Sequence, residues 1–137
     1  MPALSAAEAR ARFEQAPVAR LATVSAAGEP HLVPIVFALV RSTIVTAVDH
    51  KPKSTPRLKR LRNIAETGRV AVLVDEYADD WAQLWWARAD GLARVVDHAA
   101  EELDAALTAR YRQYADHRPG GPFILIEVER WSGWTAR

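Results

Sequence analysis

The chain contains no cysteine. Disulfide bonds, zinc–thiolate sites and catalysis by a thiol are therefore excluded. No apolar run approaches the roughly 20 residues that a membrane-spanning helix needs, and residues 1–13 lack the apolar centre of a signal peptide. We therefore expect a cytoplasmic protein with no membrane partner.

Strong net charge is also lacking, because 18 Lys and Arg residues nearly balance 17 Asp and Glu residues. A nearly neutral chain has no global field that attracts a polyanion, so the composition argues against a nucleic-acid partner. The motifs HExxH, GxSxG and GxGxxG are absent, and the four histidines show no ligand spacing. We therefore predict no metal site and assign no catalytic side chain; a cofactor must supply any difficult chemistry.

The length of 137 residues and an ordinary globular composition predict a single domain over residues 1–137. Ser5 and Glu8 have the spacing of a capping box, which predicts a helix that ends near Gln15. Two more helices are expected over residues 56–67, after Thr55 as N-cap, and over residues 97–114, with Asp97 as N-cap.

Six segments have the composition of β-strands: residues 18–25, 31–40, 43–48, 69–75, 81–96 and 123–129. Pro34 predicts an edge strand or a bulge in the second segment, and Gly91 predicts a bulge in the fifth. The exposed backbone at Pro34 suits contact with a planar ring, although a plain edge strand explains the pattern equally well. Short strands with turn signals indicate a β-barrel with flanking helices.

Positive charge is concentrated in residues 51–69, where seven of 19 residues are Lys or Arg and only Glu66 is acidic. The predicted helix begins inside this segment, and a helix N-terminus with nearby cations favours a phosphate group. Lys59 and Arg60 lie one turn into that helix. A solvated basic face and a nucleic-acid patch are the alternatives for the same pattern.

Tryptophan is abundant, with five residues. Trp81, Trp85 and Trp86 precede Gly91, and Trp131 and Trp134 lie near the C-terminus. Core or dimer packing explains any single tryptophan, whereas for Trp86 and Trp134 contact with a cofactor or substrate is an equal alternative.

Two segments carry a resemblance to a known family. Residues 58–73, LKRLRNIAETGRVAVL, and the hairpin that runs from Ala19 through Gly28 to Pro34 and Ile35 resemble the split β-barrel flavin-binding family related to pyridoxamine 5′-phosphate oxidase. Residues 75–91 and the terminal RWSGW are most similar to its actinobacterial branch of deazaflavin (coenzyme F420)-dependent enzymes. Leu58 replaces the usual Ser or Thr, so Ser54 or Thr55 is expected to supply that hydroxyl.

The resemblance implies a mainly β fold with flanking helices, a six-stranded antiparallel split β-barrel of the FMN-binding type. It also implies an oxidoreductase that transfers a hydride between F420 and a small organic substrate. An FMN-dependent oxidoreductase and a non-catalytic flavin- or F420-binding protein are the alternatives. The family's C-terminal R-x-H motif is absent, so pyridoxamine phosphate oxidation itself is not expected.

The resemblance further implies a homodimer with its cofactor sites at the subunit interface. Arg88 and Trp134 are expected at the substrate face. The expected cofactor-binding residues are Val33, Pro34, Ile35, Val36, Phe37, Val48, Asp49, Lys53, Ser54, Thr55, Lys59, Arg60 and Trp86.

Overall fold

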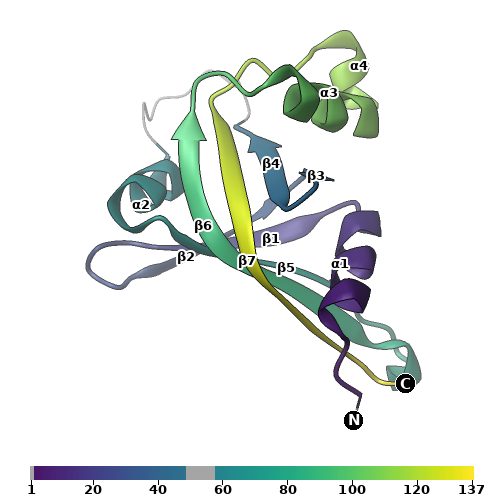
Figure 1. Ribbon diagram of the computed structural model, residues 1–137. Coiled ribbons are helices and arrows are strands. Elements are labelled where there is room, and N and C mark those ends of the chain that lie inside the picture. Colours follow the sequence, from purple (N-terminus) through teal and green to yellow (C-terminus); the bar gives the residue numbers. More distant parts are fainter. Residues whose placement is uncertain (1, 49–57) are drawn as a thin grey trace.

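A seven-stranded antiparallel sheet with helices around it dominates the computed structural model, which describes residues 2–48 and 58–137 (Figure 1). The strand order across the sheet is β2-β1-β5-β6-β7-β4-β3. The elements in chain order are α1 (Ala6–Gln15), β1 (Ala19–Val24), β2 (Pro30–Ile35), β3 (Ala38–Val40), β4 (Thr43–Ala47), α2 (Lys59–Thr67), β5 (Arg69–Glu76), η1 (Trp81–Gln83), β6 (Trp85–Val96), α3 (Glu101–Arg110), α4 (Gln113–Asp116) and β7 (Phe123–Thr135).

The prediction of six strands is wrong by one, because the segment 31–40 forms two strands, β2 and β3. The interruption lies at Val36 and Phe37, whereas Pro34 remains inside β2 opposite Arg20. Proline is tolerated there because β2 is an edge strand, as predicted, and its missing N–H leaves no gap in a ladder. β2 and β3 are the two edges of the sheet, so the described strands form an open sheet that is not closed into a barrel.

The two longest strands, β6 and β7, lie side by side through the centre of Figure 1. The prediction placed the start of β6 at residue 81, but the strand begins at Trp85 after the 3₁₀ turn η1. Asp80 caps that turn by accepting from the Ala82 amide at 3.0 Å. β7 also extends to Thr135, beyond its predicted end at residue 129.

The bulge predicted at Gly91 is confirmed, because the β6–β7 register shifts between Asp90 and Gly91. Asp90 faces Arg130 and Gly91 faces Val128, which leaves Glu129 as the extra residue of β7. A Cβ atom on Gly91 would lie only 2.2 Å from the Glu127 carbonyl oxygen. Only glycine lets the two backbones approach this closely.

The N-terminal segment pairs with the end of β7. Ala3 forms a bridge with Trp134, and the Thr135 amide donates to the Pro2 carbonyl oxygen at 3.2 Å. The Leu4 amide donates to the Gly133 carbonyl oxygen at 3.0 Å. The N- and C-terminal ends therefore lie together at one corner of the molecule (Figure 1).

The capping box of α1 is confirmed, since Ser5 Oγ accepts from the Glu8 amide at 3.1 Å and the Ser5 amide donates to Glu8 Oε1 at 2.8 Å. α2 begins at Lys59, three residues later than predicted, because Leu58 has an extended backbone. It ends at Thr67, and Gly68 follows with a φ of 71° that suits a left-handed cap, as predicted.

The predicted helix over residues 97–114 is two helices, α3 and α4. Ala100, and not Asp97, is the N-cap of α3. Tyr111 interrupts the helical backbone with φ −121° and ψ 127°. α4 follows as a single turn.

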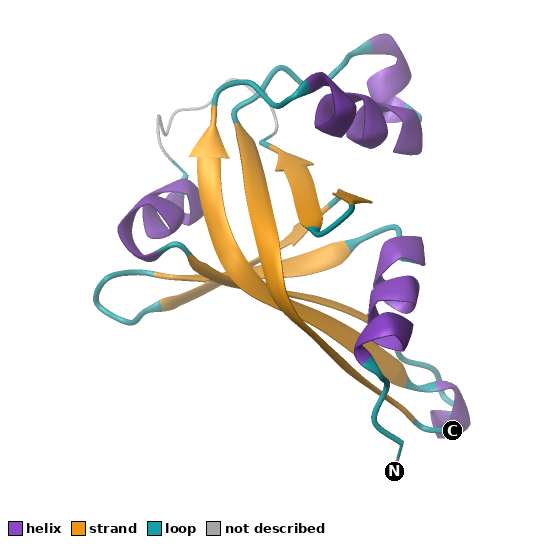
Figure 2. Ribbon diagram, in the orientation of Figure 1, coloured by secondary structure: helices purple, strands orange, loops and turns teal. Residues whose placement is uncertain are grey.

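The apolar side chains form two clusters. The larger one contains Phe13 of α1, Ile64 of α2 and Ile126 of β7. The smaller one contains Leu107 of α3 and Leu125 of β7. Alternate residues of β7 face opposite sides of the sheet, so α3 covers the face opposite to the larger cluster (Figure 2). Among the described residues, no helix combines the length and apolar character needed to cross a membrane.

Candidate functional site

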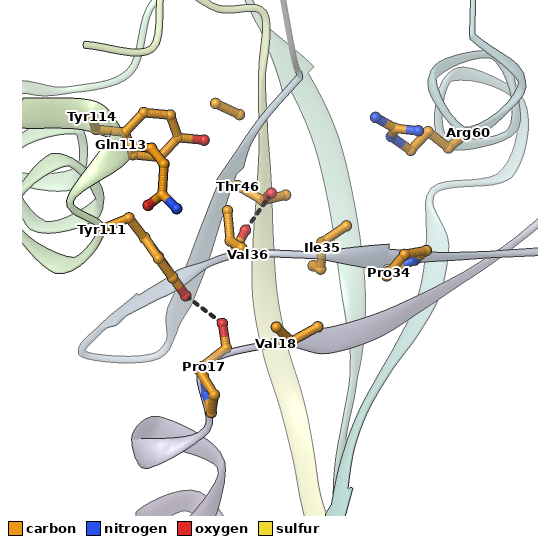
Figure 3. Close-up of a pocket in the computed structure, with 11 residues that line it drawn as sticks. Pro17, Val18, Pro34, Ile35, Val36, Thr46, Arg60, Tyr111, Gln113 and Tyr114 are labelled. Atoms are coloured by element: carbon orange, nitrogen blue, oxygen red, sulfur yellow. Dashed lines mark hydrogen bonds between the residues drawn. The ribbon is translucent and has the colours of Figure 1, made fainter. Parts of the chain in front are cut away.

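A cavity of about 540 Å³ lies between the edge strand β2, strand β4 and the helical segment α3–α4. Figure 3 shows the side chains that surround it. Ligand pockets in proteins typically measure about 300–1,000 Å³. The lining residues are Pro17, Val18, Pro34, Ile35, Val36, Thr46, Ala47, Arg60, Tyr111, Gln113 and Tyr114.

The floor of the cavity is the interruption between β2 and β3. Ile35 is the last residue of β2, and Val36 leaves the ladder. Thr46 of β4 donates a hydrogen bond of 2.7 Å from its hydroxyl to the Val36 carbonyl oxygen. This bond holds the interrupted backbone against β4, so the apolar floor has a defined shape.

Arg110 and Tyr111, at the end of α3, hold the same interruption from the other side. The Phe37 amide donates to the Tyr111 hydroxyl at 3.0 Å, and that hydroxyl lies 3.0 Å from the Pro17 carbonyl oxygen. Arg110 donates to the Phe37 carbonyl oxygen at 2.6 Å and also to the carbonyl oxygen of Ala16. Its guanidinium lies 4.7 Å from the centroid of the Phe37 ring. The end of α3 is thus joined to the β2–β3 interruption and to the segment before β1.

Arg60 lies on the opposite side of the cavity from the tyrosines (Figure 3). It belongs to the first turn of α2, and this helix is fixed to β1 by two hydrogen bonds. Buried Asn63 donates from Nδ2 to Thr23 Oγ1 at 2.9 Å, and Thr67 Oγ1 donates to the Val24 carbonyl oxygen at 3.0 Å. The helix therefore presents a cation at the rim of an apolar cavity.

Lys59 does not line the cavity. Its Nζ lies 3.7 Å from Glu29 Oε1, on the turn between β1 and β2. Two adjacent helical residues point about 100° apart, which separates Lys59 from Arg60.

The other predicted residues divide into three groups. Val33 packs against the larger apolar cluster, and Phe37 and Val48 are buried within it. Trp86, Arg88 and Trp134 do not line the cavity at Arg60. Asp49, Lys53, Ser54 and Thr55 lie outside the described residues.

A second cavity of about 340 Å³ contains two of those predicted residues. Its lining consists of Tyr77, Leu84, Trp85, Trp86 and Trp134. Trp86 and Trp134 are cross-strand partners in β6 and β7. Arg88 Nε donates to Asp90 Oδ2 at 3.1 Å, and its guanidinium lies 5.5 Å from the Trp86 ring centroid. Within one chain, no described residue lines both this aromatic cavity and the cavity at Arg60.

The sequence interpretation missed one wall of the cavity at Arg60. No role in a site was assigned to Tyr111, Gln113 or Tyr114. The sequence contains little local signal for this wall, because the position of α3–α4 depends on contacts with residues about 74 positions away, such as the Tyr111–Phe37 bond. Thr46 and Ala47 were missed although they directly precede the predicted contact at Val48.

Comparison with known proteins identifies the family. The profile described as pyridoxamine 5′-phosphate oxidase matches residues 5–135, nearly the whole chain. The chain belongs to the pyridoxamine 5′-phosphate oxidase family. No functionally curated protein matches it closely enough to count as a relative.

Solved structures share the fold of this pyridoxamine 5′-phosphate oxidase family member. A FAD-binding protein from Mesorhizobium loti is 22% identical, with a TM-score of 0.76 over 96% of this chain and 93% of that one. The FAD-binding protein of Mycobacterium smegmatis is 19% identical, with a TM-score of 0.66 over 98% and 97%. The heme storage protein HutZ of Vibrio cholerae is also 19% identical, with a TM-score of 0.67 over 88% and 87%. At these identities the likeness concerns the fold.

Proposed function

We propose that the cavity at Arg60 binds a phosphate-bearing flavin or deazaflavin cofactor. The observation that supports it is the cation of Arg60 at one end of an apolar cavity that is large enough for a ring system. Arg60 pairs with the phosphate, and Pro34, Ile35 and Val36 contact the ring. Lys53, Ser54 and Thr55 remain proposed phosphate ligands because they shortly precede α2 in the sequence.

We further propose an oxidoreductase that transfers a hydride between coenzyme F420 and a small organic substrate, with FMN as the alternative cofactor. The bound cofactor supplies the hydride chemistry. The described lining residues contribute binding and exclusion of water, since they include no His, Cys, Asp or Glu that could exchange a proton near neutral pH. The similarity of residues 75–91 to F420-dependent relatives supports F420.

A non-catalytic cofactor-binding protein is the second candidate. The same lack of acid–base side chains among the described lining residues favours it. The fold likeness to a heme storage protein adds support, because that protein is described as storing a ligand. Hydride transfer to an acceptor by the purified, cofactor-loaded protein would exclude this candidate.

We also propose a cytoplasmic homodimer whose contact is the sheet face away from α1. One row of cross-strand partners on this face runs Pro34, Arg20, Leu73, Arg88 and Ser132. The row therefore begins at the rim of the cavity and ends next to the aromatic cavity. The Ser132 hydroxyl is buried without a hydrogen-bond partner among the described residues, which favours a further contact at this face.

Such a contact gives a role to predicted cofactor-binding Trp86 and predicted substrate-face residues Arg88 and Trp134. These three residues do not line the cavity at Arg60 in their own chain, so we propose that they complete the cofactor site of the partner subunit.

Titration of the purified protein with F420, FMN and FAD in parallel tests the cofactor assignment. Replacing both cations, Lys59→Ala with Arg60→Ala, is expected to weaken cofactor binding more than tenfold while circular dichroism stays unchanged. Each lost charge-assisted bond costs about 1.5–3 kcal/mol. Arg60→Ala alone should account for most of the loss, because Lys59 contacts Glu29 instead.

Arg62→Ala is the matched control on the same helix, since Arg62 is exposed and does not line the cavity. We expect it to leave FMN affinity unchanged and to weaken F420 binding, because the acidic tail of F420 attracts additional cations. Unchanged FMN and F420 affinity in the double variant would contradict the phosphate assignment.

A further inference from the structure

The wall opposite Arg60 has a composition that the phosphate assignment does not explain. It consists of Tyr111, Gln113 and Tyr114, all from the connection between β6 and β7. The two tyrosine rings are nearly perpendicular, with centroids 6.2 Å apart. In Figure 3, Tyr111, Gln113 and Tyr114 all lie across the cavity from Arg60.

This wall is held in place by contacts on several sides. Arg110 and Tyr111 join it to Phe37, as described above. Arg118, after α4, donates to Asp104 Oδ1 of α3 at 3.1 Å, and Leu107 is fully buried in the smaller cluster. Contacts of Arg110, Tyr111 and Arg118 therefore position the Gln113 backbone without using the Gln113 side chain.

The Gln113 side chain itself is exposed and makes no hydrogen bond to any other described residue. A primary amide offers two N–H donors and one carbonyl acceptor. An amide can therefore pair side by side with a group that presents a carbonyl next to an N–H. The pyrimidine edge of a flavin or deazaflavin ring is such a group, with an N–H between two carbonyls.

We propose that Gln113 recognises the carbonyl–N–H edge of the bound ring. The ring then spans the cavity, with its pyrimidine edge at Gln113 and the tyrosines and its phosphate-bearing chain directed toward Arg60. The ligand class that the site selects is a heterocyclic imide joined to an anion. This inference rests on the proposed function and adds to it the residue that sets the direction of the ring.

Binding of two ligands to two forms of the protein, wild type and Gln113→Leu, tests the pairing between Gln113 and the ring. FMN carries the imide N–H, whereas 3-methyl-FMN has a methyl group in its place and is otherwise identical. The wild-type protein is expected to bind FMN about five- to tenfold more tightly than 3-methyl-FMN, in line with the loss of one or two neutral hydrogen bonds. Gln113→Leu is expected to bind both probes with the same, weaker affinity.

Gln83→Leu is the matched control, because Gln83 is exposed in η1 and lines neither cavity described above. It should keep the wild-type preference. Riboflavin, which has the ring without the phosphate, should respond to Gln113→Leu and be insensitive to Arg60→Ala.

The outcomes separate the two proposals. One outcome is that FMN binding depends on Arg60 while wild type and Gln113→Leu show the same preference for FMN over 3-methyl-FMN. This result overturns the inference about Gln113 and leaves the phosphate assignment intact. Absence of binding by FMN, riboflavin and F420 overturns both. A preference that disappears only in Gln113→Leu supports the pairing.

Discussion

Single residues decide which groups reach the cavity at Arg60. Lys59 and Arg60 are adjacent and chemically alike, yet one pairs with Glu29 and the other lines the cavity. A cluster of like charges in a sequence therefore shows where a phosphate site is expected without showing which cation serves it. The helical rotation between neighbours and the position of the β1–β2 turn determine which of the two cations faces the cavity.

Gly91 is a residue whose replacement has a defined structural consequence. Gly91→Ala places a methyl group against the Glu127 carbonyl oxygen, where the Cβ position is only 2.2 Å away. Because that oxygen belongs to a paired backbone, β7 must shift, and we expect destabilisation of about 1–3 kcal/mol or more. Thermal or denaturant unfolding measures the loss.

Gly28→Asn is the control for the Gly91 prediction. Gly28 has φ 85° in the β1–β2 turn, and apart from its chain neighbours no heavy atom lies within 4 Å of its Cβ position. Asn tolerates this left-handed backbone, so we expect little change in stability. Equal stability of Gly91→Ala and the wild type would show that the bulge relaxes without cost.

At the scale of elements, the order of strands and helices was predicted well, and their ends less well. The predictions of the strand segments and of the α1 capping box depend on local patterns: each predicted strand segment overlaps a strand of the structure, and the capping box was confirmed. The division of residues 31–40 into β2 and β3 was not predictable, since the interruption is held by Thr46 and by Tyr111 from distant elements. The early start expected for α2 followed Thr55 and Pro56, whereas Leu58 is extended.

The same reasoning explains how much of the site was predictable. Pro34 to Val36 and Arg60 were identified from local motifs, and the structure brings them together. The wall formed by α3–α4 was missed, because no local pattern reveals which strand a connecting helix will contact. Trp86 and Trp134 are cross-strand partners in β6 and β7, but they line a different cavity from Arg60 in the same chain.

The attachment of α3 to the β3–β4 turn predicts a pH effect. Arg41 donates to both carboxylate oxygens of Glu102, at 2.8 and 2.9 Å, and these bonds lower the pKa of Glu102. A lowered folded-state pKa means that the pair stabilises the fold above the unfolded-state pKa of Glu102. That contribution is lost as the pH falls through the lower, folded-state value.

Arg41→Asn is expected to return the pKa of Glu102 toward the ordinary Glu value of about 4.3. Asn suits the positive φ of 56° at this position, so the substitution removes the ion pair without new backbone strain. Carboxyl NMR titration measures the shift. The pKa of Glu8, lowered by its hydrogen bonds with Ser5, serves as the internal control and should not change. An unchanged Glu102 titration would show that the pair does not persist in solution.

At the scale of the whole molecule, the proposed dimer contact is the testable feature. We expect light scattering to report twice the chain mass. Leu73→Arg places a third cation between Arg20 and Arg88 in the middle of the proposed contact, and it is expected to yield monomers. Ala105→Arg, on the exposed side of α3, is the control and should remain dimeric.

Cofactor affinity should fall together with the dimer if the partner completes the site. If a monomeric Leu73→Arg variant binds FMN or F420 as tightly as the wild type, each cofactor site lies within one chain. A wild-type protein that is monomeric would contradict the proposed contact itself.

The pairing of residues 2–4 with the end of β7 has a practical consequence for engineering. Because both ends of the chain lie at one corner, a short Gly/Ser linker can join them, and new ends can be opened in the β1–β2 turn at Ala26 and Ala27. Such a circular permutant should fold with the same sheet. A tether attached at the native corner also leaves the α3–α4 side, at the far end of the molecule in Figure 1, accessible to ligands in an immobilised sensor.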